Sequence, residues 1–165
     1  MKRLVIAILV GVLIGCAGGL GYYYHKENQG FKVSYWKHPP AIVDCTHGAL
    51  EYSRLIESVS FWEKNGHKFT FIENDPATSM CNLDHIYGFI IIKNDTLDWP
   101  TIGKTSKASE INGEIRSVLI RLNVGNANDP KLLEHEIGHA LGYRHYNELG
   151  HIMHEIYDYS GYDFY

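Results

Sequence analysis

The sequence predicts an α+β protein, in which one globular domain at residues 26–165 follows a hydrophobic N-terminal segment at residues 1–25. The chain has 165 residues, which is enough for one domain with a well-formed core. Several short segments are either apolar throughout or alternate between apolar and polar residues, and they predict a sheet of about four or five strands. Two longer segments, residues 48–64 and 130–141, have apolar residues at helical spacing and predict two main helices.

Composition and charge exclude several classes of protein. Apolar residues make up 45% of the chain and charged residues 21%, which excludes a disordered chain and a coiled coil. The formal net charge is -4, and the sequence contains no run of Lys and Arg. Binding to nucleic acid needs a concentrated basic surface, so we expect no nucleic-acid partner.

The N-terminal segment has the layout of a secretory signal. Lys2 and Arg3 give it a basic start, and residues 4–15 are all apolar or glycine. Three outcomes remain open. The segment is a cleaved signal peptide, a membrane anchor that continues to the tyrosines at residues 22–24, or a lipoprotein signal in which Cys16 is acylated. Each outcome places residues 30–165 in the periplasm or outside the cell, with the membrane as a partner in two of them.

The remaining elements follow from local patterns along the chain. In the first helix, Leu55, Ile56, Val59 and Trp62 fall on one face, and Asn65-Gly66 ends the run. The alternating or β-branched segments predict the strands, while a mixture of Asp, Asn, Gly, Pro, Ser and Thr predicts a long surface loop. We expect strands at residues 31–36, 68–73, 86–93 and 115–124, and the loop at residues 94–114.

The cysteine content of the globular part is a single pair, Cys45 and Cys81. In an oxidising compartment such a pair indicates a disulfide, which stabilises a fold by constraining the unfolded chain. The alternative is two buried free thiols.

The second helix carries two histidines on one face. Asp129 followed by Pro130 is a typical helix start, and Gly142 is a typical stop. His135 and His139 lie one turn apart, so both imidazoles can reach one ion. Zinc in a catalytic site takes three protein ligands and keeps one position open, so a third ligand is expected nearby.

His145 supplies this third ligand, because Gly142 lets the chain turn back toward the helix. The full pattern from His135 to His145 is HExxHxxGxxH. Glu136 follows the first ligand directly and is placed to take a proton from an attacking water molecule. A chance match to this pattern has a probability on the order of 10⁻⁴ for a chain of this composition.

This pattern resembles the signature of the metzincin zinc peptidases, and the sequence looks closest to their matrixin branch. Met153, eight residues after His145, is similar to the methionine of the family's turn beneath the metal, and Tyr157 to the tyrosine of the specificity pocket. Glu155 stands where matrixins usually have proline. The resemblance implies a metzincin-like zincin domain with a twisted mixed sheet and one catalytic Zn²⁺ at the active-site helix.

The resemblance also implies a function, a zinc-dependent endopeptidase with a protein or peptide substrate. Residues 115–123 resemble the edge strand that binds extended substrate in matrixins, and we expect substrate to lie along them. Two alternatives are a non-catalytic zinc-binding or adhesion domain and a zinc hydrolase that acts on cell-wall peptides. The natural substrate and the oligomeric state are left open.

Overall fold

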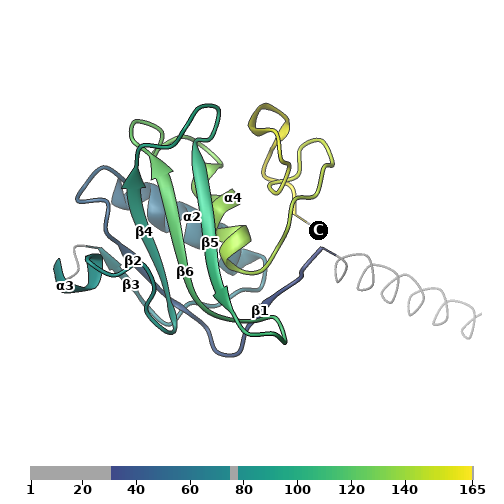
Figure 1. Ribbon diagram of the computed structural model, residues 1–165. Coiled ribbons are helices and arrows are strands. Elements are labelled where there is room, and N and C mark those ends of the chain that lie inside the picture. Colours follow the sequence, from purple (N-terminus) through teal and green to yellow (C-terminus); the bar gives the residue numbers. More distant parts are fainter. Residues whose placement is uncertain (1–30, 75–77, 165) are drawn as a thin grey trace, which may run out of the picture. The chain divides into compact units, whose positions relative to one another are not determined.

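The computed structural model describes residues 31–74 and 78–164 of the chain (Figure 1). The chain divides into two units at Lys32–Val33, and the described strands and helices all lie in the second unit. The predicted signal or anchor segment and the Cys16 lipidation site lie outside the described residues. Within the described ranges, no helix is long and apolar enough to cross a membrane.

The second unit is built on a six-stranded mixed sheet with the order β1-β6-β4-β2-β3, in which β5 also pairs with β6. All pairings are parallel except the antiparallel pairing of β5 with β6. The predicted α+β class is therefore confirmed, although the sheet has more strands than expected. The strands are β1 (Tyr35–Trp36), β2 (Ala41–Asp44), β3 (Ile72–Asn74), β4 (Phe89–Asp95), β5 (Gly103–Ser109) and β6 (Glu114–Asn123).

Two main helices, α2 (Tyr52–Lys64) and α4 (Leu132–Ala140), cover the same face of this sheet (Figure 1). A short helix, α3 (Thr78–Cys81), and a 3₁₀ turn, η1 (Tyr157–Tyr159), complete the described helical elements. Leu55, Val59 and Trp62 of α2 are buried as predicted, whereas Ile56 is only partly buried. The helix ends at the predicted Asn65-Gly66, where Gly66 has a φ of 86°.

The prediction for the first part of the sheet was wrong in detail. The strand expected at residues 31–36 is reduced to β1, and β2 was missed although all four of its residues are buried. Strand β2 was not predicted because it directly follows Pro39-Pro40, and a pair of prolines indicates a break in regular structure. The strand expected at residues 68–73 begins only at Ile72, in β3, and the one expected at residues 86–93 begins only at Phe89, in β4.

The prediction of a long loop at residues 94–114 was also wrong, because this segment contains β5. This strand has the sequence Gly-Lys-Thr-Ser-Lys-Ala-Ser, which lacks the alternation of apolar and polar residues that predicts a strand. It exists through backbone pairing with β6, for example Thr105 opposite Ile120 and Lys107 opposite Val118. A tight turn closes the pair, with a hydrogen bond from the Glu110 N–H to the Glu114 carbonyl.

Strand β6 is not the edge strand that residues 115–123 were expected to form. It pairs with β4 on one side, at Ile90↔Val118 and onward, and with β5 on the other side. Its backbone groups are therefore occupied by the sheet. Among the described strands β1, β3 and β5 each have a single partner, and β5, which pairs only with β6, therefore has one edge that no other described strand covers.

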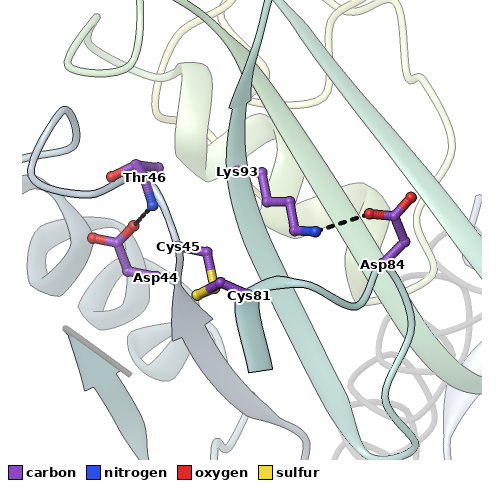
Figure 2. Close-up of a disulfide and its surroundings, with 6 residues drawn as sticks. All are labelled: Asp44, Cys45, Thr46, Cys81, Asp84 and Lys93. Atoms are coloured by element: carbon purple, nitrogen blue, oxygen red, sulfur yellow. Dashed lines mark hydrogen bonds and ion pairs between the residues drawn. A yellow bond between two sulfur atoms is a disulfide. The ribbon is translucent and has the colours of Figure 1, made fainter. Parts of the chain in front are cut away.

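The predicted disulfide between Cys45 and Cys81 is present, on the face of the sheet away from α4 (Figure 2). Here Val43, Ile91 and Leu119 form a small buried cluster with Cys45. Met80, Cys81, Ile86 and Phe89 pack against it. Burial of both faces explains why Ile90, Ile91 and Ile92 form a continuous apolar run in place of an alternation.

Removing this disulfide is expected to lower the free energy of unfolding without disturbing the opposite face of the sheet. The two cysteines are 36 residues apart. A crosslink that closes a loop of this length stabilises a fold by about 3–4 kcal/mol. The measurement is urea denaturation of the Cys45→Ala/Cys81→Ala variant beside the oxidised chain. An unchanged midpoint would show that the crosslink carries no stability.

Candidate metal centre

The helix α4 positions two of the three candidate ligands, although it begins two residues later than predicted. It starts at Leu132, directly after Lys131, which has a φ of 69°. No side-chain hydrogen bond caps this helix, and the Asp129 carboxylate instead accepts a hydrogen bond of 2.7 Å from the Asn126 amide. The helix ends at Ala140, close to the predicted stop at Gly142, whose φ is 105°.

The three predicted histidines come together at one point. His135 and His139 lie one turn apart on α4, and His145 returns from the segment that follows Gly142. One ring nitrogen from each of the three lies within 4.8 Å of the others. The Nε2 atoms of His139 and His145 are 3.1 Å apart. Among the described residues this cluster could hold a metal ion.

Backbone carbonyls fix the orientation of the two helical imidazoles. Nδ1 of His135 lies 2.8 Å from the Ile152 carbonyl oxygen, and Nδ1 of His139 lies 2.9 Å from that of Tyr143. A carbonyl oxygen can only accept, so each Nδ1 donates and carries the proton. The lone pair of each neutral ring is thus on Nε2, the atom available to a metal.

The protonation state of these rings also suits a metal ligand. Burial is the main cause that lowers the pKa of His135 to about 4 and that of His139 to about 3. Both imidazoles are therefore neutral at pH 7, and a metal ion does not have to displace protons from them.

A zinc ion fits this set of donors. Zinc binds imidazole nitrogen at about 2.0–2.1 Å in tetrahedral geometry, which places two ligand atoms about 3.3 Å apart. The observed separation of the His139 and His145 Nε2 atoms, 3.1 Å, is close to that value. His145 is exposed, so the cluster faces solvent on one side. Three imidazole ligands beside an open side are typical of catalytic zinc sites.

Met153 is fully buried and packs against Gly138 of α4. A Cβ atom built on Gly138 would lie 2.2 Å from the Met153 sulfur and 2.7 Å from the Trp62 ring. The glycine therefore lets α4 approach the segment that contains Ile152, whose carbonyl orients His135. Sequence reasoning singled out Met153 but missed Gly138, because this position is variable in the recognised pattern.

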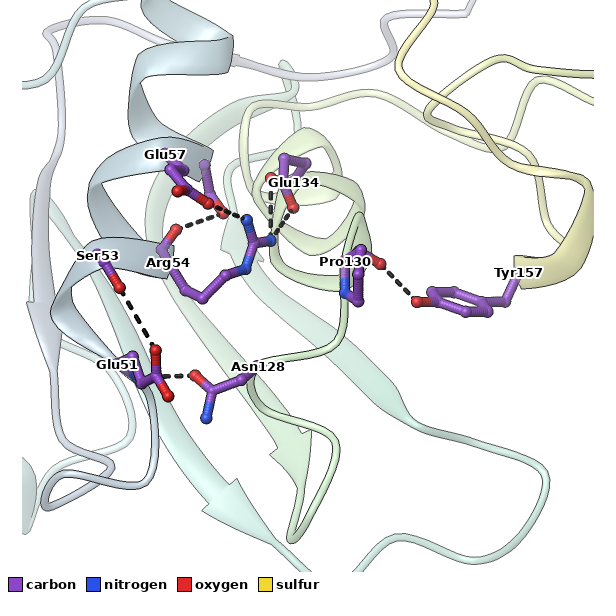
Figure 3. A network of polar contacts seen from close by, with 9 residues as sticks. Glu51, Ser53, Arg54, Glu57, Asn128, Pro130, Glu134 and Tyr157 are labelled. Atoms are coloured by element: carbon purple, nitrogen blue, oxygen red, sulfur yellow. Dashed lines mark hydrogen bonds and ion pairs between the residues drawn. The ribbon is translucent and has the colours of Figure 1, made fainter.

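A buried ion pair joins α4 to α2 (Figure 3). One guanidinium nitrogen of Arg54 donates to both carboxylate oxygens of Glu134, at 3.0 and 2.8 Å. The Trp62 indole donates to the Glu134 backbone carbonyl at 2.8 Å. Glu134 is 2% exposed, and loss of Arg54 would leave a buried unpaired charge. The pair was not predicted, because the two residues are 80 positions apart.

Glu136 is buried and lies against β5. The Thr105 hydroxyl donates to one carboxylate oxygen at 2.5 Å, and a Cβ atom built on Gly103 would lie 2.6 Å from the other. Burial raises the pKa of Glu136 to about 7, while the hydrogen bond from Thr105 opposes the rise. A carboxyl group with this pKa can both accept and return a proton near neutral pH. Thr105 and Gly103 were missed, since they lie in the segment predicted as a loop.

One cavity of about 710 Å³ contains the three histidines and Glu136 in its lining. Strand β5 lines this cavity on one side, from Gly103 to Lys107. Tyr157 lines it too, and its hydroxyl donates to the Pro130 carbonyl at 2.5 Å. The structure thus brings the predicted ligands, the predicted base and Tyr157 to a single cavity.

Substitution of Gly142 by alanine is expected to destabilise the fold by about 2–4 kcal/mol and to weaken metal binding. A Cβ atom here would lie 1.9 Å from the Ser34 carbonyl oxygen, and the φ of 105° is unfavourable for alanine. The turn that returns His145 would have to shift. Thermal unfolding and zinc titration measure both effects.

Gly125→Ala is the matched control for this substitution. Gly125 also has a positive φ, of 94°, but nothing lies within 4 Å of its Cβ position. It should cost only about 1 kcal/mol, the backbone contribution alone. Equal losses in the two variants would contradict the role of the contact with Ser34.

Comparison with known proteins gives no family for this chain. No family model matches it, and no curated protein sequence matches it.

Proposed function

We propose that this protein is a zinc-dependent endopeptidase of the metzincin type. One observation carries the proposal, the convergence of three imidazole groups beside a buried carboxylate in a single cavity. Two of the imidazoles present Nε2 because their Nδ1 atoms donate to carbonyls. The carboxylate, Glu136, directly follows the first of the three in sequence.

Zinc bound to these histidines would polarise the scissile carbonyl and lower the pKa of the attacking water. Glu136 accepts the proton of that water and returns it to the leaving nitrogen. The raised pKa of about 7 suits both steps. Thr105 positions the carboxylate through its hydrogen bond to Oε2.

The open edge of β5 supports an extended peptide as substrate. A peptide can add to a free strand edge through backbone hydrogen bonds, with alternate side chains in pockets. Strand β5 lines the cavity and contacts Glu136 through Thr105. The substrate strand is therefore proposed to lie along β5 and not, as the sequence suggested, along β6. Tyr157 is proposed to line the pocket for one substrate side chain.

The burial of Glu136 argues against a non-catalytic domain. Burying a carboxyl group that must ionise costs stability, and no cation pairs with Glu136 among the described residues. A purely structural metal site gains nothing from such a group. A site that moves protons uses it directly.

The proposed location is extracytoplasmic, with residues 1–25 as the membrane anchor, lipoprotein signal or cleaved signal peptide. The disulfide between Cys45 and Cys81 supports an oxidising compartment.

The test is metal analysis of the full chain combined with hydrolysis assays. We expect stoichiometric zinc and cleavage of unfolded casein, which a chelator abolishes and added zinc restores. Purified peptidoglycan is assayed in parallel. Cleavage of peptidoglycan alone would support a cell-wall hydrolase, and bound zinc without any hydrolysis would support a non-catalytic domain.

A further inference from the structure

Lys107 brings a positive charge to the cavity. It lies two residues after Thr105 on β5, so its side chain leaves the strand on the same face. Its partner across the antiparallel pairing is Val118, as Ile120 is the partner of Thr105. Lys107 lines the cavity together with His139 and His145.

The ammonium group of Lys107 has no anionic partner in the part of the chain that the structure describes. Its side chain is partly buried, and burial lowers its pKa. Two other partly buried lysines each have a partner for their ammonium group. Lys93 pairs with Asp84 at 2.9 Å, and Lys131 donates to the Ser160 carbonyl at 2.9 Å.

The acidic residues that line the cavity do not neutralise this charge. Glu136 accepts its hydrogen bond from Thr105 and is buried behind the strand. Glu155 and Asp158 line the cavity from the C-terminal segment, and neither forms an ion pair with Lys107. A cation that is partly removed from water and left unpaired favours an anionic ligand.

We propose that Lys107 is a specificity-determining residue that selects peptides with an acidic side chain close to the scissile bond. The inference rests on the proposed peptidase function. Thr105 holds Glu136, which must face the reacting carbonyl, and Lys107 lies one strand repeat away, about 7 Å. The acidic side chain is thus within one or two residues of the bond that is cleaved.

Two matched sets of fluorogenic peptides test the selection, with Glu or Gln at each of the three positions on either side of the scissile bond. The measured quantity is the Glu/Gln ratio of kcat/KM for the full chain with zinc. We expect a ratio of about ten at one position, the value of a partly desolvated ion pair. Lys107→Gln should bring this ratio close to one.

Two further variants control the test. Lys107→Arg keeps the charge and should keep a ratio well above one. Lys68→Gln removes one positive charge from an exposed position outside the cavity and should leave the ratio at the wild-type value. Thermal unfolding of each variant establishes that it is folded.

An equal ratio in the full chain and in Lys107→Gln would overturn the proposal. The proposal would also be overturned if Lys107→Gln lowered kcat/KM equally for Glu and Gln peptides, because Lys107 would then have a general role in the reaction. If no peptide is cleaved, the proposed peptidase function fails. The selection of acidic peptides by Lys107 is then tested by peptide binding alone. Fluorescence anisotropy of the labelled peptides with zinc-loaded Glu136→Gln protein measures that binding, and no preference for Glu would overturn the inference.

Discussion

Replacing Glu136 by glutamine is expected to lower kcat by about 10²–10⁴-fold while zinc stays bound. Glutamine has nearly the same shape and can still accept the hydrogen bond from Thr105, but it cannot take up a proton. The three histidines are unchanged, so metal content should remain stoichiometric. Normal turnover would remove Glu136 as the base.

The same variant should be more stable than the parent when zinc is absent. The pKa of Glu136 is raised to about 7 in the fold, above its usual value of 4.5. The unfolded chain therefore loses this proton more readily, and the group costs stability increasingly as pH rises from about 4.5 through 7. Removing it should stabilise the metal-free protein by about 1–3 kcal/mol at pH 8, and by little at pH 4.5.

Thermal unfolding at the two pH values, in the presence of a chelator, measures this gain. Glu63→Gln is the matched control, because Glu63 is exposed on α2 and lies outside the cavity. It should change neither hydrolysis nor the pH dependence of stability. A Glu136→Gln variant with no gain at pH 8 would contradict the burial of an ionisable group.

Replacing His145 by alanine is expected to weaken zinc binding by more than about a hundredfold and to abolish hydrolysis. Loss of a neighbour that merely orients a ligand already costs 10–100-fold in affinity, and the loss of a ligand costs more. The fold should persist, because His145 is exposed and lies outside the helices and strands. Zinc titration against a competing chelator measures the effect.

His38→Ala is the control for this experiment, since His38 is exposed and is not among the residues that line the cavity. It should keep wild-type affinity. If His145→Ala also kept it, the third ligand would be a different residue.

The histidine cluster could be predicted from sequence because its residues are local. His135, His139 and His145 span one helix and one turn, where spacing and a glycine determine which side chains meet. The buried face of α2 and the disulfide of the single cysteine pair could be predicted for similar reasons. These features depend on short-range geometry or on the absence of competing partners.

Long-range contacts could not be read in this way. The Thr105 hydrogen bond to Glu136 joins residues 31 positions apart, and no pattern in either segment indicates it. Strand β5 is polar, and only its backbone pairing with β6 defines it. The misplaced edge strand has the same origin. Val118, Leu119 and Ile120 are consecutive and all fully buried, so both faces of β6 are covered there.

The open edge of β5 also bears on self-association. A strand with one unpaired row of backbone amides and carbonyls can dock against the same strand of another copy, which is a common route to aggregation. Lys104 and Lys107 place two positive charges on this strand, and two copies that met edge to edge would bring these charges together. The lysines therefore discourage such dimers.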